Sequence, residues 1–586
     1  MGSKFIINIS RAKKIPFYLS KEDGIIDLTK TITDIHKNEI SLNFINDEII
    51  KKSLDNYILF TKKIALFSKN NLSYRINNFT IFFITNTSVK HPYYVWAKDF
   101  FILQTILIEK KNEIELKYNS LVLLLPNNLK FIEKEFNQWF ALLNYKIPIT
   151  YYYVENNGIK LTFFLILKVT LINLFRINNY KPNSRTTQKN KTNIFLINKI
   201  DDKHLSNNIY LELKKLFNNK QTDLCILPLL DWIKQDNVDI DFYYAKPSIF
   251  QQIWFCFQLI FLYTKITFLK ISESIKIERL NIPLSFLKFE LIQALYKSNN
   301  FLIVHIWLIN YLKRKKYSIN FFFEDEFYES GRIISSAIRL VNKDRKIKHR
   351  AFALQHGHFN EIHTVYTITD EDVQIGLSMP DKFICWGNYY KQLFLSNNSI
   401  SENFVEVLGN PKYVNNCSHN MAPSEVKNIL WCLTTKECLE TEWNILKQYD
   451  SLNSFNITIR LHPLGHIKAE ELKHLIKGLN FKLSSLPNIE DEFAQNHLII
   501  CSAHSTIFLD ALVFKKYCIR IVSRLWVGNK SFDNALLYTV KNFDEFNNAI
   551  NQIIQKKIDW NIQHTSNILE LNKDKWYKFI DKLKSA

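Results

Sequence analysis

The sequence predicts an α/β protein in which two Rossmann-like domains face a cleft, with an extra N-terminal α/β region before them. Three observations lead to this prediction. The chain of 586 residues is longer than one hydrophobic core usually organises. From Ser318 onward, short apolar runs alternate with helical segments of about 10–15 residues, the pattern of parallel βαβ units. Polar clusters directly follow several of these runs, at the strand ends where open α/β sheets bind ligands.

These observations divide the chain into three regions. We expect residues 1–185 to form an N-terminal α/β region to which the sequence assigns no role. Residues 186–415 are predicted to form the N-terminal Rossmann-like half, which includes apolar helices across 250–312 and binds the acceptor. Residues 416–586 are predicted to form the C-terminal Rossmann-like half, which binds the nucleotide donor.

Runs rich in β-branched and aromatic residues, bounded by polar or turn-forming residues, predict the strands. Longer helical patterns separate these runs, one of them at Gly331–Val341, and the Asn- and Lys-rich residues 178–193 predict a linker or an exposed loop. In chain order the predicted strands are Phe5–Ile9, Thr80–Thr85, Leu121–Leu125, Asn193–Ile197, Ile319–Phe323, Arg350–Leu354, Thr364–Ile368, Lys382–Cys385, Val405–Leu408, Asn428–Leu433, Ile457–Leu461, Lys482–Ser484, Leu498–Cys501 and Cys518–Val522.

Composition narrows the class of protein. A hydrophobic content of 47% excludes a disordered chain. The formal net charge of +20 suits an anionic donor or anionic lipid headgroups, or it reflects lysines spread over a solvated surface. No basic and aromatic block or zinc-finger pattern marks a nucleic-acid partner. Eight cysteines lie mostly in apolar runs without metal-ligand spacing, and no signal-peptide pattern is present, which predicts a cytoplasmic protein without a metal site.

Two apolar segments raise the question of a membrane. Leu161–Phe175 is interrupted by Lys168, and Ile253–Thr264 ends at Lys265, so both are shorter than the roughly 20 apolar residues that cross a bilayer. In the second segment apolar residues recur at helical spacing. This pattern fits a buried helix, or a helix that contacts an anionic membrane peripherally, on the cytoplasmic face of the inner membrane.

The strand Ile457–Leu461 is followed by His462 and Pro463. Arg460 and His462, two residues apart, lie on the same side of an extended chain, and Pro463 ends the ladder. A histidine and an arginine at the carboxyl end of a strand suit the phosphate of a nucleotide. The alternative is a simple strand-end turn.

The strand Leu498–Cys501 leads through Ser502 into a small polar turn and a helix. The hydroxyls of Ser505 and Thr506 stand at the helix start, where they either cap free N–H groups or bind a phosphate. Because Arg460 and His462 precede them in the chain, we favour the phosphate role. Asp510, one turn further along the helix, is placed to accept ribose hydroxyls.

The arrangement Arg460-Leu461-His462-Pro463, a Ser505-Thr506 turn and an Asp510-Ala511 helix resembles the C-terminal halves of GT-B sialyltransferases and Kdo transferases. The resemblance implies a GT-B-like fold, and it implies that His462, Ser505 and Thr506 hold the phosphate of a CMP-activated sugar. The chain also resembles CDP-glycerol glycerophosphotransferases of capsule and teichoic-acid assembly. Those proteins have His-Gly, Gly-x-Pro, basic-x-His and Ser-Ser elements in the order found here over residues 318–522, where Ser-Thr replaces Ser-Ser.

Glycosyl transfer to a hydroxyl requires a general base, and two groups in the N-terminal half are candidates. Glu324, Asp325 and Glu326 crowd a strand end, where like charges raise carboxyl pKa values, unless they form only a solvated acidic loop. The resemblance to sialyltransferases implies a base in this cluster without choosing its member. The resemblance to the CDP-glycerol polymerases instead implies His356, which Gly357 leaves open to a ligand.

The remaining candidate residues flank these groups. Glu329, Arg332, Gln355 and Gly357 are assigned to the acceptor side, and Gly409 and Asn410, at the predicted crossover between the halves, to the donor side.

The sequence thus predicts a glycosyltransferase that moves a sugar, sialic-acid-like or Kdo-like, from a CMP-activated donor to a glycan or glycolipid acceptor in bacterial surface polysaccharide synthesis. No cofactor beyond the activated sugar is expected. The alternatives are a CDP-glycerol or CDP-ribitol phosphotransferase, a nucleotide-sugar epimerase of the same fold, and a non-catalytic scaffold that binds glycan or lipid.

Overall fold

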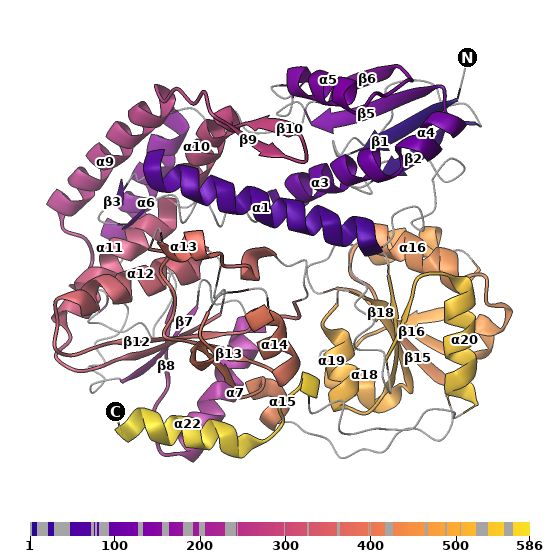
Figure 1. Ribbon diagram of the computed structural model, residues 1–586. Helices are drawn as coiled ribbons and strands as arrows, with labels where there is room; N and C mark the ends of the chain where they lie inside the picture. Colours follow the sequence, from indigo (N-terminus) through magenta and orange to yellow (C-terminus); the bar gives the residue numbers. More distant parts are fainter. Residues whose placement is uncertain are drawn as a thin grey trace.

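The computed structural model resolves the chain into three parallel sheets with helices packed around them (Figure 1). We call the parts built on these sheets the N-terminal unit, the first half and the second half. The described residues are 3–8, 22–27, 47–71, 75–76, 79–80, 93–126, 130, 133–154, 163–179, 192–197, 205–228, 242, 244–297, 299–324, 327, 329–359, 364–374, 376–396, 398, 400–415, 426–462, 467–476, 478–486, 489–503, 505–522, 537–555 and 567–585.

The N-terminal unit is a four-stranded parallel sheet in the order β2-β1-β5-β6. Its central strands are wholly apolar on the inside, because Phe5, Ile7, Leu121 and Leu123 are fully buried. The long helix α1 packs against α3 and also contacts Asp370–Gln374 of the first half. The elements are β1 (Lys4–Asn8), β2 (Gly24–Asp27), α1 (Asp47–Asn71), β3 (Arg75–Ile76), β4 (Phe79–Thr80), α3 (Tyr93–Glu109), α4 (Lys111–Lys117), β5 (Ser120–Pro126), α5 (Glu133–Leu142) and β6 (Ile149–Val154).

The first half is a six-stranded parallel sheet in the order β14-β13-β12-β11-β7-β8. The side chains of the central strand β11 alternate between two cores: Phe321 and Phe323 join the core that includes α12, whereas Phe322 joins the core of α7 and α22. The elements are β7 (Asn193–Ile197), α7 (Leu205–Asn219), β8 (Cys225–Pro228), β11 (Asn320–Phe323), α12 (Glu329–Lys343), β12 (Arg350–Leu354), α13 (Asp370–Gln374), β13 (Lys382–Cys385), α14 (Asn388–Ser396), β14 (Val405–Val407) and α15 (Pro411–Asn415).

A helical layer lies beside the first half. It consists of α6 (Phe163–Asn179), α9 (Ile249–Thr267), α10 (Leu287–Lys297) and α11 (Asn299–Arg314), and α11 packs along α12. The antiparallel hairpin β9 (Ser274–Ile277) and β10 (Leu280–Pro283) projects from this layer to the N-terminal unit, where Trp139 Nε1 donates to the carbonyl of Glu278 at 3.2 Å. The hairpin therefore fastens the N-terminal unit to the helical layer.

The second half is a six-stranded parallel sheet in the order β17-β16-β15-β18-β19-β20. Strands β18 and β19 are buried throughout, as expected for the interior of a parallel sheet covered on both faces. The elements are β15 (Asn428–Cys432), α16 (Lys436–Leu446), β16 (Asn456–Arg460), α17 (Ala469–Leu475), β17 (Phe481–Leu483), α18 (Ile489–Gln495), β18 (Leu498–Ser502), α19 (Ile507–Val513), β19 (Tyr517–Ile521), β20 (Leu537–Val540) and α20 (Phe543–Ile554).

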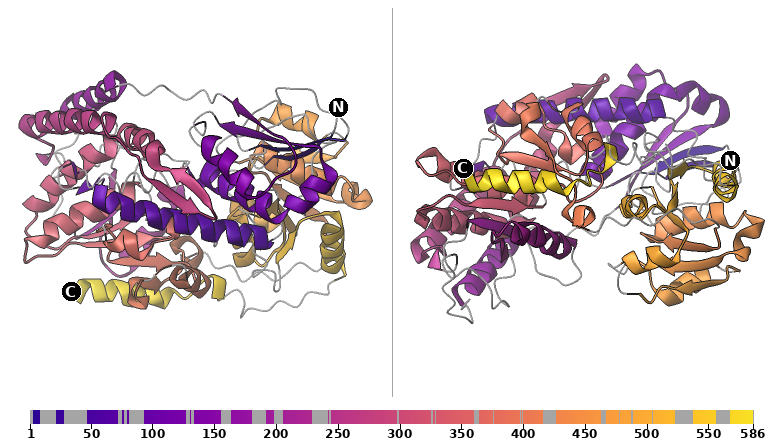
Figure 2. Two further views of the ribbon diagram at one scale, coloured as in Figure 1. Left: turned by 45° about the horizontal axis from the view of Figure 1, so that its top comes forward. Right: turned by 90° about the horizontal axis from the view of Figure 1, so that it is seen from below.

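The last helix, α22 (Lys573–Ser585), returns to the first half (Figures 1 and 2). Trp576 is fully buried there and donates from Nε1 to the carbonyl of Gly409 at 3.2 Å, and the ring of Phe579 packs against Phe352 at 5.3 Å. The segment before α22 presses on two glycines. A Cβ added to Gly387 or to Gly409 would lie 2.0 Å from the carbonyl oxygen of Ile568 or Glu570.

The topology confirms the predicted fold class, a GT-B-like pair of Rossmann-like halves with an extra N-terminal α/β part. One predicted strand is wrong: Thr364–Ile368 contains a short 3-10 helix, Thr364–Tyr366. Its backbone is bonded by the side chain of Asn398, which donates to the carbonyl of Tyr366 at 2.9 Å and accepts from the N–H of Ile368. Most of the predicted strand Thr80–Thr85 lies outside the described residues.

Candidate active site

Three neighbouring strands of the second half end at one edge of the sheet, and each is followed by polar residues. Cys432 in β15 pairs in register with Arg460 in β16 and with Cys501 in β18. The residues that follow these three positions therefore start from the same level of the sheet. The ends of β16 and β18 flank the end of β15, so the two predicted donor motifs are separated by one strand, or roughly 10 Å.

In the first motif, at the end of β16, one side chain makes hydrogen bonds within the protein. Arg460 donates from Nη1 to the hydroxyl of Ser484 at 3.1 Å and to the carbonyl of Leu486 at 2.8 Å. These bonds hold the turn after β17 against β16. His462, two residues further along, is half-buried, and Pro463 lies outside the described residues. Arg460 of this motif therefore has a structural role.

The second motif lies between β18 and α19. Ser502 is fully buried at the end of the strand, whereas Ser505 and Thr506 are half-buried. Thr506 is the N-cap residue of α19, and its side chain makes no capping hydrogen bond. The hydroxyl of Ser505 accepts weakly from the N–H of Ile507 at 3.4 Å.

Sequence reasoning missed Thr434, which lies between the two motifs. It follows β15 directly and is buried, and its Oγ1 has no hydrogen-bond partner within the part of the chain that the structure describes. A buried hydroxyl normally finds a partner, so this group is available to a ligand. The signal was present in the sequence, because Thr434 and Thr435 end the run Asn428–Leu433 in the same way that the other polar clusters end theirs.

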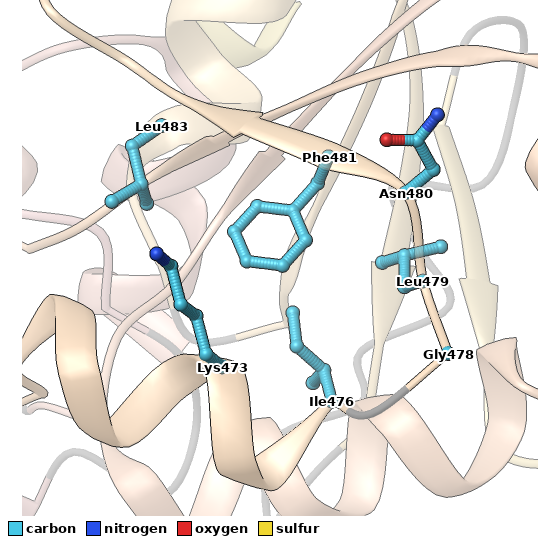
Figure 3. A pocket seen from close by; sticks show the side chains of 7 residues that line it. All are labelled: Lys473, Ile476, Gly478, Leu479, Asn480, Phe481 and Leu483. Carbon is cyan, nitrogen blue, oxygen red and sulfur yellow. The ribbon is translucent and has the colours of Figure 1, made fainter.

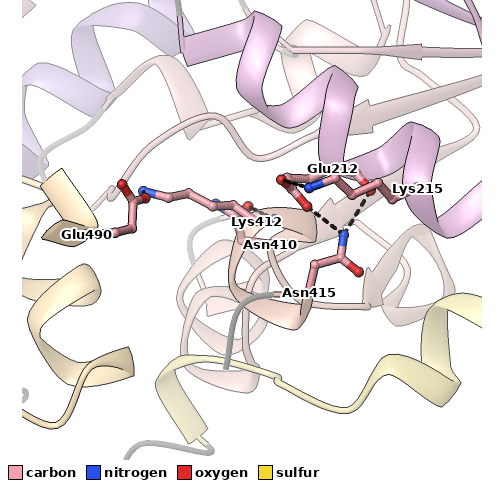
Figure 4. Close-up of polar contacts among 6 residues, drawn as sticks. All are labelled: Glu212, Lys215, Asn410, Lys412, Asn415 and Glu490. Atoms are coloured by element: carbon pink, nitrogen blue, oxygen red, sulfur yellow. Dashed lines mark hydrogen bonds and ion pairs between the residues drawn. The ribbon is translucent and has the colours of Figure 1, made fainter. Parts of the chain in front are cut away.

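Lys412 joins the two halves through a charged cluster that the sequence did not reveal. Its Nζ reaches out of α15 to the second half, where it lies 3.0 Å from Oε1 of Glu490 (Figure 4). The same Nζ lies 2.8 Å from Oδ1 of Asp510. The adjacent Tyr413 also hydrogen-bonds to Asp510. The predicted ribose-binding carboxylate is therefore engaged by the first half. In the same helix, Asn415 turns the other way and donates to the carbonyl of Glu212 at 2.9 Å.

The pKa values of Asp510 and Glu490, which share the cation of Lys412, are shifted in opposite directions. Burial raises the pKa of Asp510, and Lys412 only partly opposes this rise. Glu490 is more exposed, so the attraction of Lys412 outweighs burial and lowers its pKa. Burial lowers the pKa of Lys412, but the two carboxylates more than offset this effect and raise it. Lys412 is therefore a permanent cation at the boundary between the halves.

A second contact between the halves is aromatic. The ring of His358, in the first half, meets the ring of Phe508 in α19 edge-on at 5.1 Å. Nδ1 of His358 lies 3.0 Å from the hydroxyl of Tyr390, and the guanidinium of Arg520 lies 4.6 Å from the centre of the Phe508 ring. The carboxyl end of the first sheet thus faces the carboxyl end of the second, as the predicted cleft requires.

The candidate bases follow β11 and β12 of the first half. Glu324 is buried at the end of β11, and His356 is half-buried after β12. Asp325 and Glu326 lie outside the described residues. Gln355 has a structural role: its side chain accepts from the N–H of Trp386 at 2.9 Å and donates to the carbonyl of Gly357 at 2.8 Å, so it joins the ends of β12 and β13.

Among the other predicted residues, Arg332, Gly409 and Asn410 also have structural roles. Arg332 is buried in α12, where it contacts Met379 and stacks over Phe327 at 5.2 Å, and only the backbone of Glu329, the first residue of α12, is described. Gly409 has a positive φ of 84° and packs under the returning C-terminal segment. Asn410 is buried, and its side chain accepts from the N–H of Lys412 at 2.9 Å, which fixes the start of α15.

A separate hollow of about 510 Å³ lies at the edge strand β17 (Figure 3). Lys473 of α17 and Ile476, which follows that helix, line it together with residues 478–481 and Leu483. It includes none of the strand-end residues described above. Within the described ranges, no group of three or more His, Cys, Asp or Glu is placed to hold a metal ion.

No family model and no curated protein matches this chain. Among solved structures, a glycosyltransferase from Rickettsia africae ESF-5 is 14% identical with a TM-score of 0.36, over 68% of this chain and 99% of that one. MurG of Acinetobacter baumannii is 10% identical with a TM-score of 0.36, over 68% and 100%. A UDP-GlcNAc 2-epimerase from Neisseria meningitidis, bound to UDP-GlcNAc, is 10% identical with a TM-score of 0.37, over 67% and 99%. Because these TM-scores lie below 0.5, function is argued from the residues of this chain.

Proposed function

We propose that the protein is a glycosyltransferase that moves a sugar from a CMP-activated donor to a hydroxyl of a glycan or glycolipid acceptor. One observation carries the proposal. Residues that bind phosphate well, His462, Ser505 and Thr506, follow strands of one sheet whose carboxyl edge meets the other half through Lys412 and His358. Ligands of open α/β sheets bind at this edge.

The position of these residues at the facing edges of the two halves assigns each half a role in the reaction. The acceptor oxygen attacks the anomeric carbon, and the bond from that carbon to the phosphate oxygen breaks. The acceptor proton passes to Glu324 or His356, and CMP leaves with the additional negative charge. His462 and the hydroxyls of Ser505 and Thr506 stabilise this charge, which is the effect expected to supply much of the rate.

Nucleotide binding tests the donor side. A thermal-shift series with CMP, CDP, UDP, GDP and dTDP should show the largest rise in melting temperature with CMP, because a ligand that binds only the folded state stabilises it. A preference for CDP would favour a CDP-glycerol or CDP-ribitol phosphotransferase, which transfers a phosphoalditol. No shift with any nucleotide would support the scaffold that binds glycan or lipid.

The variant His462→Ala should abolish the CMP shift and lower turnover about a hundredfold while the unliganded melting temperature stays unchanged. His474→Ala, which removes an exposed histidine from α17 of the same half, is the matched control and should behave as the wild type. Full activity in His462→Ala would refute the assigned role.

The base is identified by two further variants. Glu324→Gln and His356→Asn each remove one candidate proton acceptor with little change in volume. The variant that loses turnover but keeps CMP binding identifies the base, because a base acts on the acceptor and not on the nucleotide. If the wild type converts the CMP-activated sugar into an altered donor without any acceptor, the reaction is an epimerisation.

A further inference from the structure

Helix α9 combines a buried side with an exposed side that is almost wholly apolar. Phe255, Leu259, Leu262 and Ile266 are buried in the protein core. The opposite side carries large apolar side chains in solvent, among them Phe250 at 85% and Phe261 at 69% of full exposure. We call this set the apolar face of α9; it consists of Ile249, Phe250, Ile253, Trp254, Phe257, Ile260 and Phe261.

The apolar face continues beyond α9. Phe268, which follows the helix, is exposed, and α6 lies beside α9, joined to it by paired hydrogen bonds of 2.9 Å between Asn178 and Gln252. In α6, Phe164, Leu171 and Phe175 are exposed as well. Soluble proteins rarely leave so many large apolar side chains together in water, so this surface is expected to meet a membrane or another protein.

The charged residues of the segments that contain α9 and α6 indicate which kind of partner this apolar surface meets. Residues 247–272, which contain α9, include no Asp or Glu, and Lys265 and Lys270 are exposed. Residues 156–200, which contain α6, include eight Lys and Arg and again no Asp or Glu. An apolar surface carried by sequence segments that contain basic residues and no acidic ones complements a bilayer with anionic headgroups, because the aromatic rings enter the acyl boundary while lysines such as Lys265 and Lys270 reach the phosphates.

We propose that α9, with α6 beside it, docks the protein on an anionic lipid bilayer, with α9 lying in the plane of the headgroups. By length and composition α9 is also able to cross a membrane. Its fixed side argues for the interfacial arrangement: Gln252 is buried and bonded to Asn178, and Gln251 bonds to Asn310 at 3.1 Å. A spanning helix would have to leave the core that it completes.

The position of α9 suits this arrangement. The helix runs along the outer edge of the molecule, at the end opposite the second half, in Figure 1 and in the left view of Figure 2. Docking through α9 therefore holds the first half, which we assign to the acceptor, nearer the bilayer than the second half.

Vesicle sedimentation tests the proposal. The full chain is mixed with vesicles of phosphatidylcholine alone, or of phosphatidylcholine and phosphatidylglycerol in equal amounts. We expect sedimentation with the anionic vesicles and much weaker binding to the neutral ones. The variant Trp254→Glu/Phe257→Glu/Phe261→Glu should bind about a hundredfold more weakly, since three apolar contacts are lost and three repulsive charges are gained.

The matched control adds three negative charges to exposed leucines elsewhere. Leu116→Glu/Leu142→Glu/Leu211→Glu changes α4, the end of α5 and α7, and it should bind like the wild type. The variant Lys265→Gln/Lys270→Gln keeps the apolar face and should lose about fivefold for each lysine, only with anionic vesicles. Because all eight positions are exposed, circular dichroism should show unchanged folding in each variant.

Two results would overturn the proposal. One is equal binding of the wild type and of the Trp254→Glu/Phe257→Glu/Phe261→Glu variant to anionic vesicles. The other is a wild-type chain that forms concentration-dependent oligomers and ignores vesicles, with the oligomers lost in the same variant, because the face would then be covered by a second copy. Neither result depends on nucleotide binding, so the transferase proposal stands or falls separately.

Discussion

Nζ of Lys412 lies 2.8 Å from Oδ1 of Asp510, so a cation of the first half is paired with a buried carboxylate of the second half. The pair links the two halves at Asp510, which lies four residues after the predicted donor residue Thr506. Any nucleotide that uses Asp510 to bind its ribose must therefore compete with Lys412 for the carboxylate. Under the proposed function, donor binding is therefore coupled to the contact between the two halves.

The variant Lys412→Met should lower the free energy of unfolding by about 3 kcal/mol, because it leaves Asp510 buried without its cation. Adding Asp510→Asn should recover most of that loss. Chemical denaturation of the two single variants and the double variant measures the coupling. Lys215→Met, which breaks the surface pair of Lys215 with Glu212, is the control and should cost less than about 1 kcal/mol. Additive effects at 412 and 510 would show that the pair does not stabilise the boundary.

Thr434→Val should reduce nucleotide affinity about tenfold without lowering stability, because Oγ1 of Thr434 has no hydrogen bond to lose among the residues that the structure describes. Titration calorimetry with CMP measures the first effect, and thermal melting without ligand measures the second. Unchanged CMP affinity would place the donor away from the end of β15. A lower melting temperature would instead show that the hydroxyl bonds within the protein.

Gly409→Ala should destabilise the protein by about 3 kcal/mol, since the new methyl group would meet the carbonyl oxygen of Glu570 and the backbone has a positive φ. Gly387→Ala should act similarly through Ile568. The control is Gly357→Ala, where a Cβ has nothing within 4 Å and the change should stay within about 0.5 kcal/mol. Thermal melting with limited proteolysis of the C-terminal segment checks the prediction. Equal stability of the three variants would contradict the tight packing.

The protein should lose stability as the pH falls below about 6.5, in part through His305. This side chain is buried in α11 with Nε2 3.1 Å from the hydroxyl of Ser336, and burial lowers its pKa to about 3. Between pH 6.5 and 3 the unfolded state binds a proton that the folded state does not. The cost at pH 5 is therefore about 2 kcal/mol.

His305→Gln removes this proton-binding group, so its loss of melting temperature between pH 7 and pH 5 should be smaller than that of the wild type. His474→Gln, at an exposed position in α17, should follow the wild type. An identical pH dependence in all three proteins would mean that His305 is not protonated on unfolding in this range.

The interior of each sheet was predictable from the sequence, and most of its edges were not. Runs such as Asn193–Ile197 and Leu498–Cys501 are recognisable because a strand covered on both faces is continuously apolar. In the three parallel sheets, the missed strands β2, β6, β8 and β20 all lie at sheet edges. The strands β3, β9 and β10 of the two-stranded sheets were missed as well. An edge strand buries less side-chain surface, so four residues such as Cys225–Pro228 give little signal.

Residues of the candidate site were predictable only where polar side chains come shortly after a strand in the sequence. His462 and Ser505 were found because each comes shortly after an apolar run. Lys412 was missed because its partner, Asp510, lies 98 residues away and no local pattern links them. The structural role of Gln355 was also not predictable from the sequence, because its hydrogen bond to the N–H of Trp386 depends on the pairing of β12 with β13.

The return of α22 to the first half has a consequence for the synthesis of the chain. Trp576 and Phe579 complete the hydrophobic layer between α7 and the sheet of the first half, although the rest of that layer is translated far earlier. These residues are synthesised after the entire second half. The first half, made earlier, therefore keeps part of its interior open until α22 has been synthesised, and a fragment that stops at residue 415 would never acquire its missing layer.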